Sequence, residues 1–263
     1  MSDLLLTRID DRGNAGRIAY LTVNNPTRRN AIGMAGKRAI AETFNKLAQD
    51  GELRAAVITG AGDKSFIAGA DIHEMKDLTP EEAEVEHTLT HVANEAIRAF
   101  PVPVIARING YCLGFGMELA AACDLRVGVD SAKFGMPEVR VGIPSGMEAV
   151  LLPKLIGWGK AAELVYTGDI IDAAEAYRIG FLQKLVPAAE LDAAVEKWIA
   201  SLLLGGKRVM RLQKKLLRDW ERMSVDDGIW AGIRACVESR RTDEPKLMME
   251  AFINRKSLIK NSE

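Results

Sequence analysis

The chain has 263 residues, of which 48% are hydrophobic and 27% charged, and its formal net charge is −1 at pH 7. This length and composition are typical of one large globular domain, or of one domain with an appendage. A charge so close to neutral provides no overall field that would draw the molecule to nucleic acid or to an anionic membrane.

Three further features bear on location. The three cysteines, Cys112, Cys123 and Cys236, lack CxxC spacing, which favours a reducing compartment over a disulfide framework. Residues 1–11 have neither the apolar run of a signal peptide nor the acid-poor composition of a transit peptide. No window approaches the roughly 20 apolar residues that a membrane-spanning helix requires. We therefore expect a cytoplasmic protein without membrane association.

The first hundred residues alternate between predicted strands and helices. Residues 4–9 and 17–23 favour two strands that form a hairpin. Helical apolar spacing follows over 34–49, and a short apolar strand over 55–59. An acidic helix is predicted over 79–100, because the Thr-Pro-Glu-Glu at its beginning is a typical helix start.

The stretch around residue 110 combines a strand, a turn and a helix. The strand is predicted over 102–108, the glycine-containing turn over 109–116, and an almost wholly apolar helix over 117–123. Glu118 stands in the first turn of that helix, where burial is expected. Backbone N–H groups at such a helix N-terminus suit a developing negative charge, and an acid beside them suggests proton transfer. The alternative is that Glu118 only complements the helix dipole.

The rest of the chain is increasingly helical. The pattern predicts a strand over 125–129, a loop through Phe134, three short helices (148–156, 161–166 and 173–179) and a strand over 183–186. From Leu191 onward the pattern is wholly helical. Alternating strands and helices favour an α/β fold with parallel pairing. We place a boundary near residue 195, between a core of residues 1–195 and a helical region of residues 196–263.

Two more segments complete a candidate site. Residues 65–72 (SFIAGADI) again join an apolar strand, glycines and a polar helix start. Two such elements that each offer an N–H group are what an oxyanion hole needs, although glycines also simply mark turns. Glu138 lies between a proline and an apolar run. Spacing alone favours a solvated loop acid at that position.

Taken together, these segments resemble the crotonase (enoyl-CoA hydratase/isomerase) superfamily in their order and spacing. The matching segments are NNPTRRNAI (24–32), SFIAGADIHEM (65–75), INGYCLGFGMELAAACDLRV (108–127), AKFGMPEVRVGIP (132–144), LVYTGDIIDAAEAYRIGFLQKLVP (164–187) and, at the family's tail, EAFINRKS (250–257). The resemblance implies a crotonase-like spiral of repeated ββα units with a C-terminal α-helical region that serves oligomerisation, as a homotrimer or homohexamer.

The resemblance also implies roles for four residues. The backbone N–H groups of Ala70 and Phe115 form an oxyanion hole for the thioester carbonyl of an acyl-CoA. Phe115 stands where the family usually has glycine, so its ring affects the acyl pocket. Glu118 and Glu138 match the two acids of hydratases, with Glu138 as the acid toward Cα and Glu118 as the base toward water. Members that isomerise, decarboxylate or hydrolyse often keep only one of these acids, or neither.

Substrate binding is implied for seven further residues: Arg28, Arg29, Ala68, Asp71, Ile72, His73 and Ser145. Arginines suit the phosphates of CoA, although Arg28 and Arg29 also fit a solvated loop. His73 stands where a lysine often contacts CoA. Ser145 begins a segment that replaces the commoner glycine-glycine-threonine pattern, either as an altered pocket floor or as a packing variant. No metal or redox cofactor is implied, and CoA is part of the substrate.

The predicted function is that of an enoyl-CoA hydratase in fatty-acid β-oxidation. The nearest alternative is an enoyl-CoA isomerase or another acyl-CoA enzyme of the same fold. A different alternative is RNA binding or scaffolding through the basic stretch 207–218, although Val209, Leu212 and Leu216 favour an inward-packed face there. His87 and His91 have a spacing that a metal site could use, but a solvated helix face is the favoured interpretation.

Overall fold

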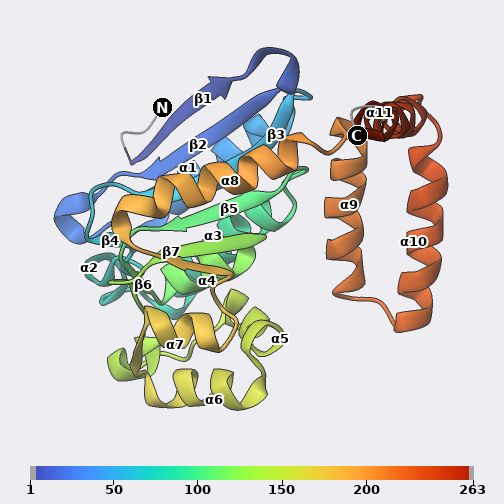
Figure 1. Ribbon diagram of the computed structural model, residues 1–263. Coiled ribbons are helices and arrows are strands. Elements are labelled where there is room, and N and C mark those ends of the chain that lie inside the picture. Colours follow the sequence, from blue (N-terminus) through green and yellow to red (C-terminus); the bar gives the residue numbers. More distant parts are fainter. Residues whose placement is uncertain (1–3, 261–263) are drawn as a thin grey trace. The chain divides into compact units, whose positions relative to one another are not determined.

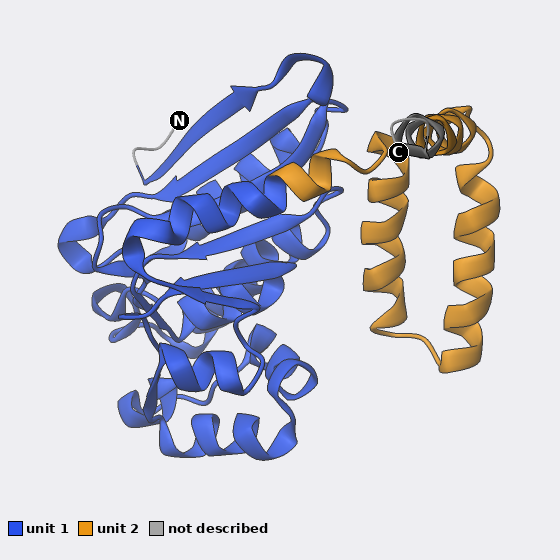
Figure 2. Cartoon of the chain, viewed as in Figure 1, with its two compact units in different colours: residues 1–199 blue, residues 200–263 orange. Residues whose placement is uncertain are grey.

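Figure 1 shows the computed structural model, which describes residues 4–260, with side chains described as far as residue 254. The chain forms two compact units, Met1–Ile199 and Ala200–Glu263 (Figure 2). Their division falls inside helix α8 (Leu191–Leu203), close to the boundary that the sequence indicates. Residues 1–3, which contribute to the expectation of no signal or transit peptide, lie outside the described residues. The side chains of residues 255–257, at the end of the tail motif, are also not described.

The larger sheet organises the first unit. Its strand order is β1 (Leu5–Asp11), β2 (Arg17–Val23), β3 (Leu53–Gly60), β5 (Val104–Ile108), β7 (Leu125–Val129) and β10 (Lys184–Val186). The predicted hairpin is confirmed, because β1 and β2 pair antiparallel, and the other neighbours pair in parallel. Parallel strands covered on both faces must be apolar on both faces, and every residue of β3 except Thr59 is buried.

A smaller sheet runs alongside, in the order β4 (Ser65–Ile67), β6 (Tyr111–Leu113), β8 (Lys133–Gly135) and β9 (Ile170–Asp172). Its strands are parallel except for the antiparallel pair of β8 and β9. The sequence patterns did not predict β6, β8 or β9, because strands of three residues are too short for an alternation to show. The pairs β3–β4, β5–β6 and β7–β8 each place one strand in either sheet before the chain turns into helix. This confirms the spiral of ββα units.

Helices cover both faces of the larger sheet. The helices of the first unit are α1 (Met34–Leu47), α2 (Ile72–Met75), α3 (Pro80–Arg98), α4 (Phe115–Ala122), α5 (Leu152–Ile156), α6 (Trp158–Thr167), α7 (Ala173–Arg178) and the beginning of α8. In Figure 1, α1 and α3 lie on one face and α8 on the other. The buried rings of Phe44 and Phe100 pack edge to face, and their centroids are 5.0 Å apart. Thr79 and Glu82 form a capping box, which confirms the predicted start of α3.

The second unit consists of α9 (Lys207–Trp220), α10 (Val225–Ser239) and α11 (Glu244–Lys260) after the end of α8. The carboxylate of Glu244 accepts hydrogen bonds from the N–H groups of Arg208 and Val209, at 3.0 and 2.9 Å, and so caps α9. Leu212 and Leu216 are partly buried as predicted, but Val209 is exposed. The prediction fails there because a helix pair covers only one stripe of each helix. Among the described helices, none is both long and apolar enough to cross a membrane.

Candidate active site

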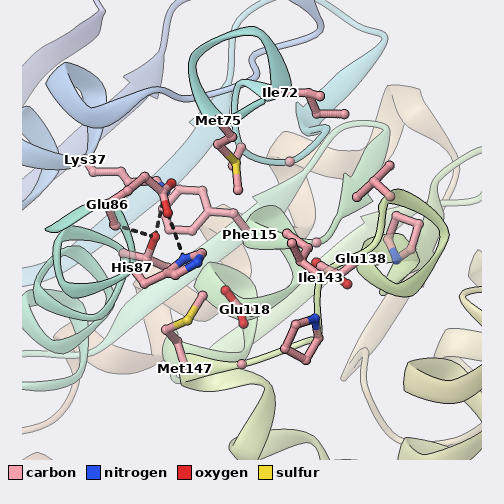
Figure 3. Close-up of a pocket in the computed structure, with 18 of the residues that line it drawn as sticks. Lys37, Ile72, Met75, Glu86, His87, Phe115, Glu118, Glu138, Ile143 and Met147 are labelled. Carbon is pink, nitrogen blue, oxygen red and sulfur yellow. Dashed lines mark hydrogen bonds and ion pairs between the residues drawn. The ribbon is translucent and has the colours of Figure 1, made fainter. Parts of the chain in front are cut away.

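A cavity of about 390 Å³ lies in the first unit, between α1, α3, α4 and the turns that follow β4 and β8 (Figure 3). It is lined by six of the residues that the sequence analysis singled out: Ala68, Ala70, Ile72, Phe115, Glu118 and Glu138. These residues come from three segments of the chain that the ββα spiral brings together. The other five do not line the cavity: Arg28, Arg29, Asp71, His73 and Ser145.

The backbone around Ala70 leaves one N–H group unused. Ile32 bonds to the residues on either side of Ala70: it donates to the carbonyl of Gly69 at 3.1 Å and accepts from the N–H of Asp71 at 3.0 Å. In such a parallel bridge, the N–H of Ala70 itself points away from Ile32. Gly69 has φ +124°, a conformation that glycine adopts without steric cost. The N–H of Ala70 has no backbone partner within residues 4–260.

Phe115 begins helix α4, so its N–H has no intrahelical partner. The N–H groups of Met117 and Glu118 do have a partner, since both donate to the carbonyl of Gly114, at 2.8 and 3.0 Å. The phenyl ring of Phe115 is buried beside Lys37, whose Nζ lies 5.0 Å from the ring centroid. The ring therefore forms part of the inner wall of the cavity.

Glu118 is the buried acid that the sequence predicts, with 2% of its surface exposed. Its Oε1 accepts a hydrogen bond of 3.3 Å from the N–H of Ala149. Helix α4 is held in place at its other end, where the buried guanidinium of Arg126 donates to the carbonyls of Ala120 and Cys123. Burial, followed by the nearby charges of Glu138 and Glu148, raises the pKa of Glu118 to about 8.

Glu138 lies in the 3₁₀ turn Pro137–Val141 and reaches the same cavity. Its Oε2 accepts a hydrogen bond of 2.8 Å from the hydroxyl of Ser145, so Ser145 acts on the site through Glu138. Burial raises the pKa of Glu138, and hydrogen bonds from its own backbone and from Ser145 offset part of that rise. The carboxylate packs closely against Gly114, since a Cβ at that residue would lie 2.5 Å from Oε1 and the carboxylate would have to shift.

The two carboxyl groups titrate as a coupled pair. The charge of Glu138 helps to raise the pKa of Glu118, so Glu138 ionises first and the remaining proton resides on Glu118. The raised pKa of Glu118 therefore favours a proton on this residue near neutral pH. The resemblance implies the opposite arrangement, in which Glu118 is the ionised base and Glu138 carries the proton.

Another buried acid near Glu118 was missed by the sequence analysis. Glu148 accepts hydrogen bonds from Asn94 at 2.8 Å and His91 at 2.7 Å, which tie the 3₁₀ turn Met147–Leu151 to α3. That turn presents the N–H of Ala149 to Glu118. His87 and His91 were expected on a solvated helix face; His91 is exposed and His87 partly exposed, but both also lie against buried acids. The sequence alone does not show such pairs, because residues far apart in the chain have no regular spacing that would indicate a contact.

The residues expected at the CoA side make contacts of their own. Asp71 caps α2, where it accepts from the N–H of His73 at 3.0 Å, and it also binds Arg28 at 2.5 Å. The guanidinium of Arg29 lies 5.3 Å from the centre of the Tyr111 ring. These contacts hold both arginines near the turn that carries Ala70. Within the described residues, no group of three or more His, Cys, Asp and Glu side chains could hold a metal ion.

Comparisons with known proteins point to one family. The family model described as enoyl-CoA hydratase/isomerase matches residues 13–258. The chain is 36% identical to the crotonyl-CoA hydratase of Syntrophomonas wolfei over 91% of this chain and 93% of the relative. It is 32% identical to the short-chain-enoyl-CoA hydratase of Clostridium acetobutylicum, over 92% and 94% of the two chains.

Solved structures match over nearly the whole chain. The enoyl-CoA hydratase of Mycobacterium smegmatis has a TM-score of 0.91 and 27% identity, covering 97% of both chains. The enoyl-CoA hydratase of Bacillus anthracis has a TM-score of 0.89 and 28% identity, covering 95% of this chain and 96% of the other. With both the sequence and the fold in agreement, the chain belongs to the enoyl-CoA hydratase/isomerase family.

Proposed function

We infer that the protein is an enoyl-CoA hydratase, which adds water across the 2,3 double bond of a 2-enoyl-CoA to give a 3-hydroxyacyl-CoA. Relatives at 36% and 32% identity are named as crotonyl-CoA and short-chain-enoyl-CoA hydratases. The observation that carries the inference is that two acids, the buried Glu118 and the partly buried Glu138, line a cavity together with Ala70 and Phe115, whose N–H groups have no backbone partner among the described residues.

Negative charge develops on the thioester oxygen when the oxygen of water, losing its proton, attacks Cβ of the 2-enoyl group. We propose that the N–H groups of Ala70 and Phe115 bind this oxygen, because preorganised donors in a dry site stabilise such charge strongly. Loss of a single donor of this kind reduces rates by about 10²–10³-fold in other enzymes. Both donors belong to the backbone, so their placement depends on Gly69 and Gly114 rather than on any side chain.

The proton balance requires one acid and one base. The ionised carboxylate takes a proton from water as its oxygen bonds to Cβ, while the protonated carboxyl gives its proton to Cα and the thioester re-forms. The pair thus ends with its proton on the other residue, and exchange with solvent restores the starting state. For Glu118 to act as the base, as the resemblance implies, the proton must move to Glu138 when the substrate binds.

Hydration is tested by following the loss of absorbance of the conjugated thioester in crotonyl-CoA and its longer homologues. We expect turnover by the purified protein without added metal or redox cofactor, since all the groups in this scheme belong to the chain. A folded protein that hydrates no 2-enoyl-CoA of any chain length would contradict the proposal.

RNA binding is less well supported. Basic side chains of α9 are engaged in ion pairs within their own unit: Arg208 pairs with Glu238, and Lys215 with Asp219 at 2.5 Å. Neutralised side chains attract phosphates weakly. A salt-dependent gel shift in the absence of hydration would favour this alternative.

We further propose a cytoplasmic homotrimer or homohexamer that serves fatty-acid β-oxidation. The three free cysteines suit a reducing compartment. Helix α10 exposes a series of apolar side chains at helical spacing: Val225, Ile229, Trp230, Ile233 and Val237. Apolar faces of this kind are usually covered by a partner. Light scattering should give three or six times the mass of the chain, whereas a monomeric mass would contradict this assembly.

A further inference from the structure

The inner wall of the cavity, beyond Glu118, is polar. Lys37 of α1 hydrogen-bonds to Glu86 and, at 2.6 Å, to Thr90 of α3, and all three residues are buried. Nδ1 of His87 lies 2.8 Å from Oε2 of Glu86. Figure 3 shows Lys37, Glu86 and His87 gathered at one end of the cavity, with Glu118 between them and Glu138. The proposed hydration reaction uses none of these four side chains.

Stability does not account for this arrangement. Removing a lysine and a glutamate from water costs several kcal/mol for each ion, and apolar replacements of similar size are often as stable or more stable. Burial also lowers the pKa of Lys37, which shows that its charge is poorly solvated there. Ligand pockets are mostly apolar, and their few polar groups fix the orientation of the ligand and its specificity. A polar end wall in a substrate cavity therefore indicates a polar substrate group.

The acyl chain is the part of the substrate that reaches this wall. The cavity opens beside Ile72 and Val141, which are exposed, and it ends at the buried residues Lys37 and Thr90. A cavity of about 390 Å³ is too small for the large, multiply charged CoA portion, which must remain outside. The acyl chain consequently enters first and extends past Glu118 toward the polar end.

His87 is the member of the cluster that a ligand can touch, since 39% of its side chain is exposed. Nδ1 of His87 and Oε2 of Glu86 lack the alignment of a hydrogen bond, but the nearby negative charge of Glu86 still favours the tautomer with its hydrogen on Nδ1. This tautomer leaves Nε2 as a hydrogen-bond acceptor. No described residue bonds to Nε2. Glu86, itself held by Lys37 and Thr90, is then a positioning residue for the imidazole.

We propose that the preferred substrate is a 2-enoyl-CoA whose acyl chain ends in a hydroxyl group, which donates a hydrogen bond to Nε2 of His87. This inference rests on the proposed hydratase function. A carboxylate is less suited, because the charge of Lys37 is already balanced by Glu86 and the cavity contains the acids Glu118 and Glu138. A methyl group in the same place would leave the imidazole nitrogen without a donor, at a cost of about 1–3 kcal/mol.

The test compares three substrates on the wild-type protein. They are 5-hydroxypent-2-enoyl-CoA, its near-isostere hex-2-enoyl-CoA, and the carboxylate hex-2-enedioyl-CoA, each beside its next longer homologue. We expect kcat/KM to favour the hydroxyl substrate over the alkyl substrate by about 5- to 150-fold, the range of one unmade buried hydrogen bond. A preference for the alkyl or the carboxylate substrate, or none at all, would overturn the inference. Turnover of crotonyl-CoA decides the hydratase function separately.

Three variants identify the residues responsible. His87→Phe should bring the ratio of hydroxyl to alkyl kcat/KM close to one, whereas His87→Gln, which keeps a polar end, should retain part of it. Glu86→Gln should also lower the ratio of hydroxyl to alkyl kcat/KM, because it removes the charge that orients the imidazole of His87. Glu84→Gln is the matched control, because Glu84 is an exposed acid on the same helix. A ratio that survives in His87→Phe would exclude His87 as the specificity-determining residue, even if Tm changes.

Discussion

The hydroxyl of Ser145 donates a hydrogen bond of 2.8 Å to the carboxylate of Glu138. A hydrogen bond to the charged form of an acid lowers its pKa, so removing it makes the acid harder to ionise. In Ser145→Ala the pKa of Glu138 should rise, and the acidic limb of the kcat/KM profile should move to higher pH. Ser145→Thr keeps the hydroxyl and is the control. An acidic limb that stays in place in Ser145→Ala would show that the contact does not tune Glu138.

Replacement of either acid separates hydration from isomerisation. Glu118→Gln and Glu138→Gln each keep the shape of the side chain but remove one proton-transfer group, and such groups contribute about 10²–10⁴-fold. We expect hydration of crotonyl-CoA to fall by that factor in both variants, and by little in the exposed control Glu84→Gln. If one of the two variants retains isomerisation of a 3-enoyl-CoA at the wild-type rate, the protein is an isomerase rather than a hydratase.

The sequence predicted much of the fold, because the spacing of apolar residues within a long helix or strand, and the turn residues between elements, are local features of the chain. The hairpin, α1, α3, α4 and the buried acid Glu118 all followed from such local patterns. Strands β6, β8 and β9 did not, because three residues show no period and their pairing is decided by distant segments.

The site was predicted mainly through the family resemblance. That resemblance assigned Ala70, Phe115, Glu118 and Glu138, and the structure brings all four to one cavity, whereas spacing alone favoured a solvated loop acid at Glu138. The polar end of that cavity depends on a pairing across 49 residues, between Lys37 and Glu86. One signal was present: Lys37 lies three residues before Ile40 and seven before Phe44, on the apolar stripe of its helix. Only the fold reveals which acid meets it.

Activity should depend on pH through the proton that the two acids share. The pKa of Glu118 is about 8, so above that pH both acids are ionised and no acid remains to protonate Cα. We expect kcat/KM for crotonyl-CoA to be constant near neutral pH and to fall about tenfold for each pH unit above 8. Far-UV circular dichroism over the same range checks that the fold persists. A rate that stays level to pH 10 would mean that no proton with this pKa is needed.

Gly114→Ala should damage both stability and catalysis. Residue 114 has φ +50° and ψ −121°, a backbone conformation that L side chains rarely adopt and that costs about 1–3 kcal/mol, and the added methyl group would lie 2.5 Å from Oε1 of Glu138. Relief of that contact must move Glu138, and displacements of about 1 Å in an active site cost roughly 10²-fold in rate. Gly159→Ala is the control, since a Cβ there meets nothing within 4 Å. Urea unfolding measures the first effect and hydration of crotonyl-CoA the second. Loss of stability with an unchanged kcat would show that Glu138 keeps its place, and hence that Gly114 serves the backbone alone.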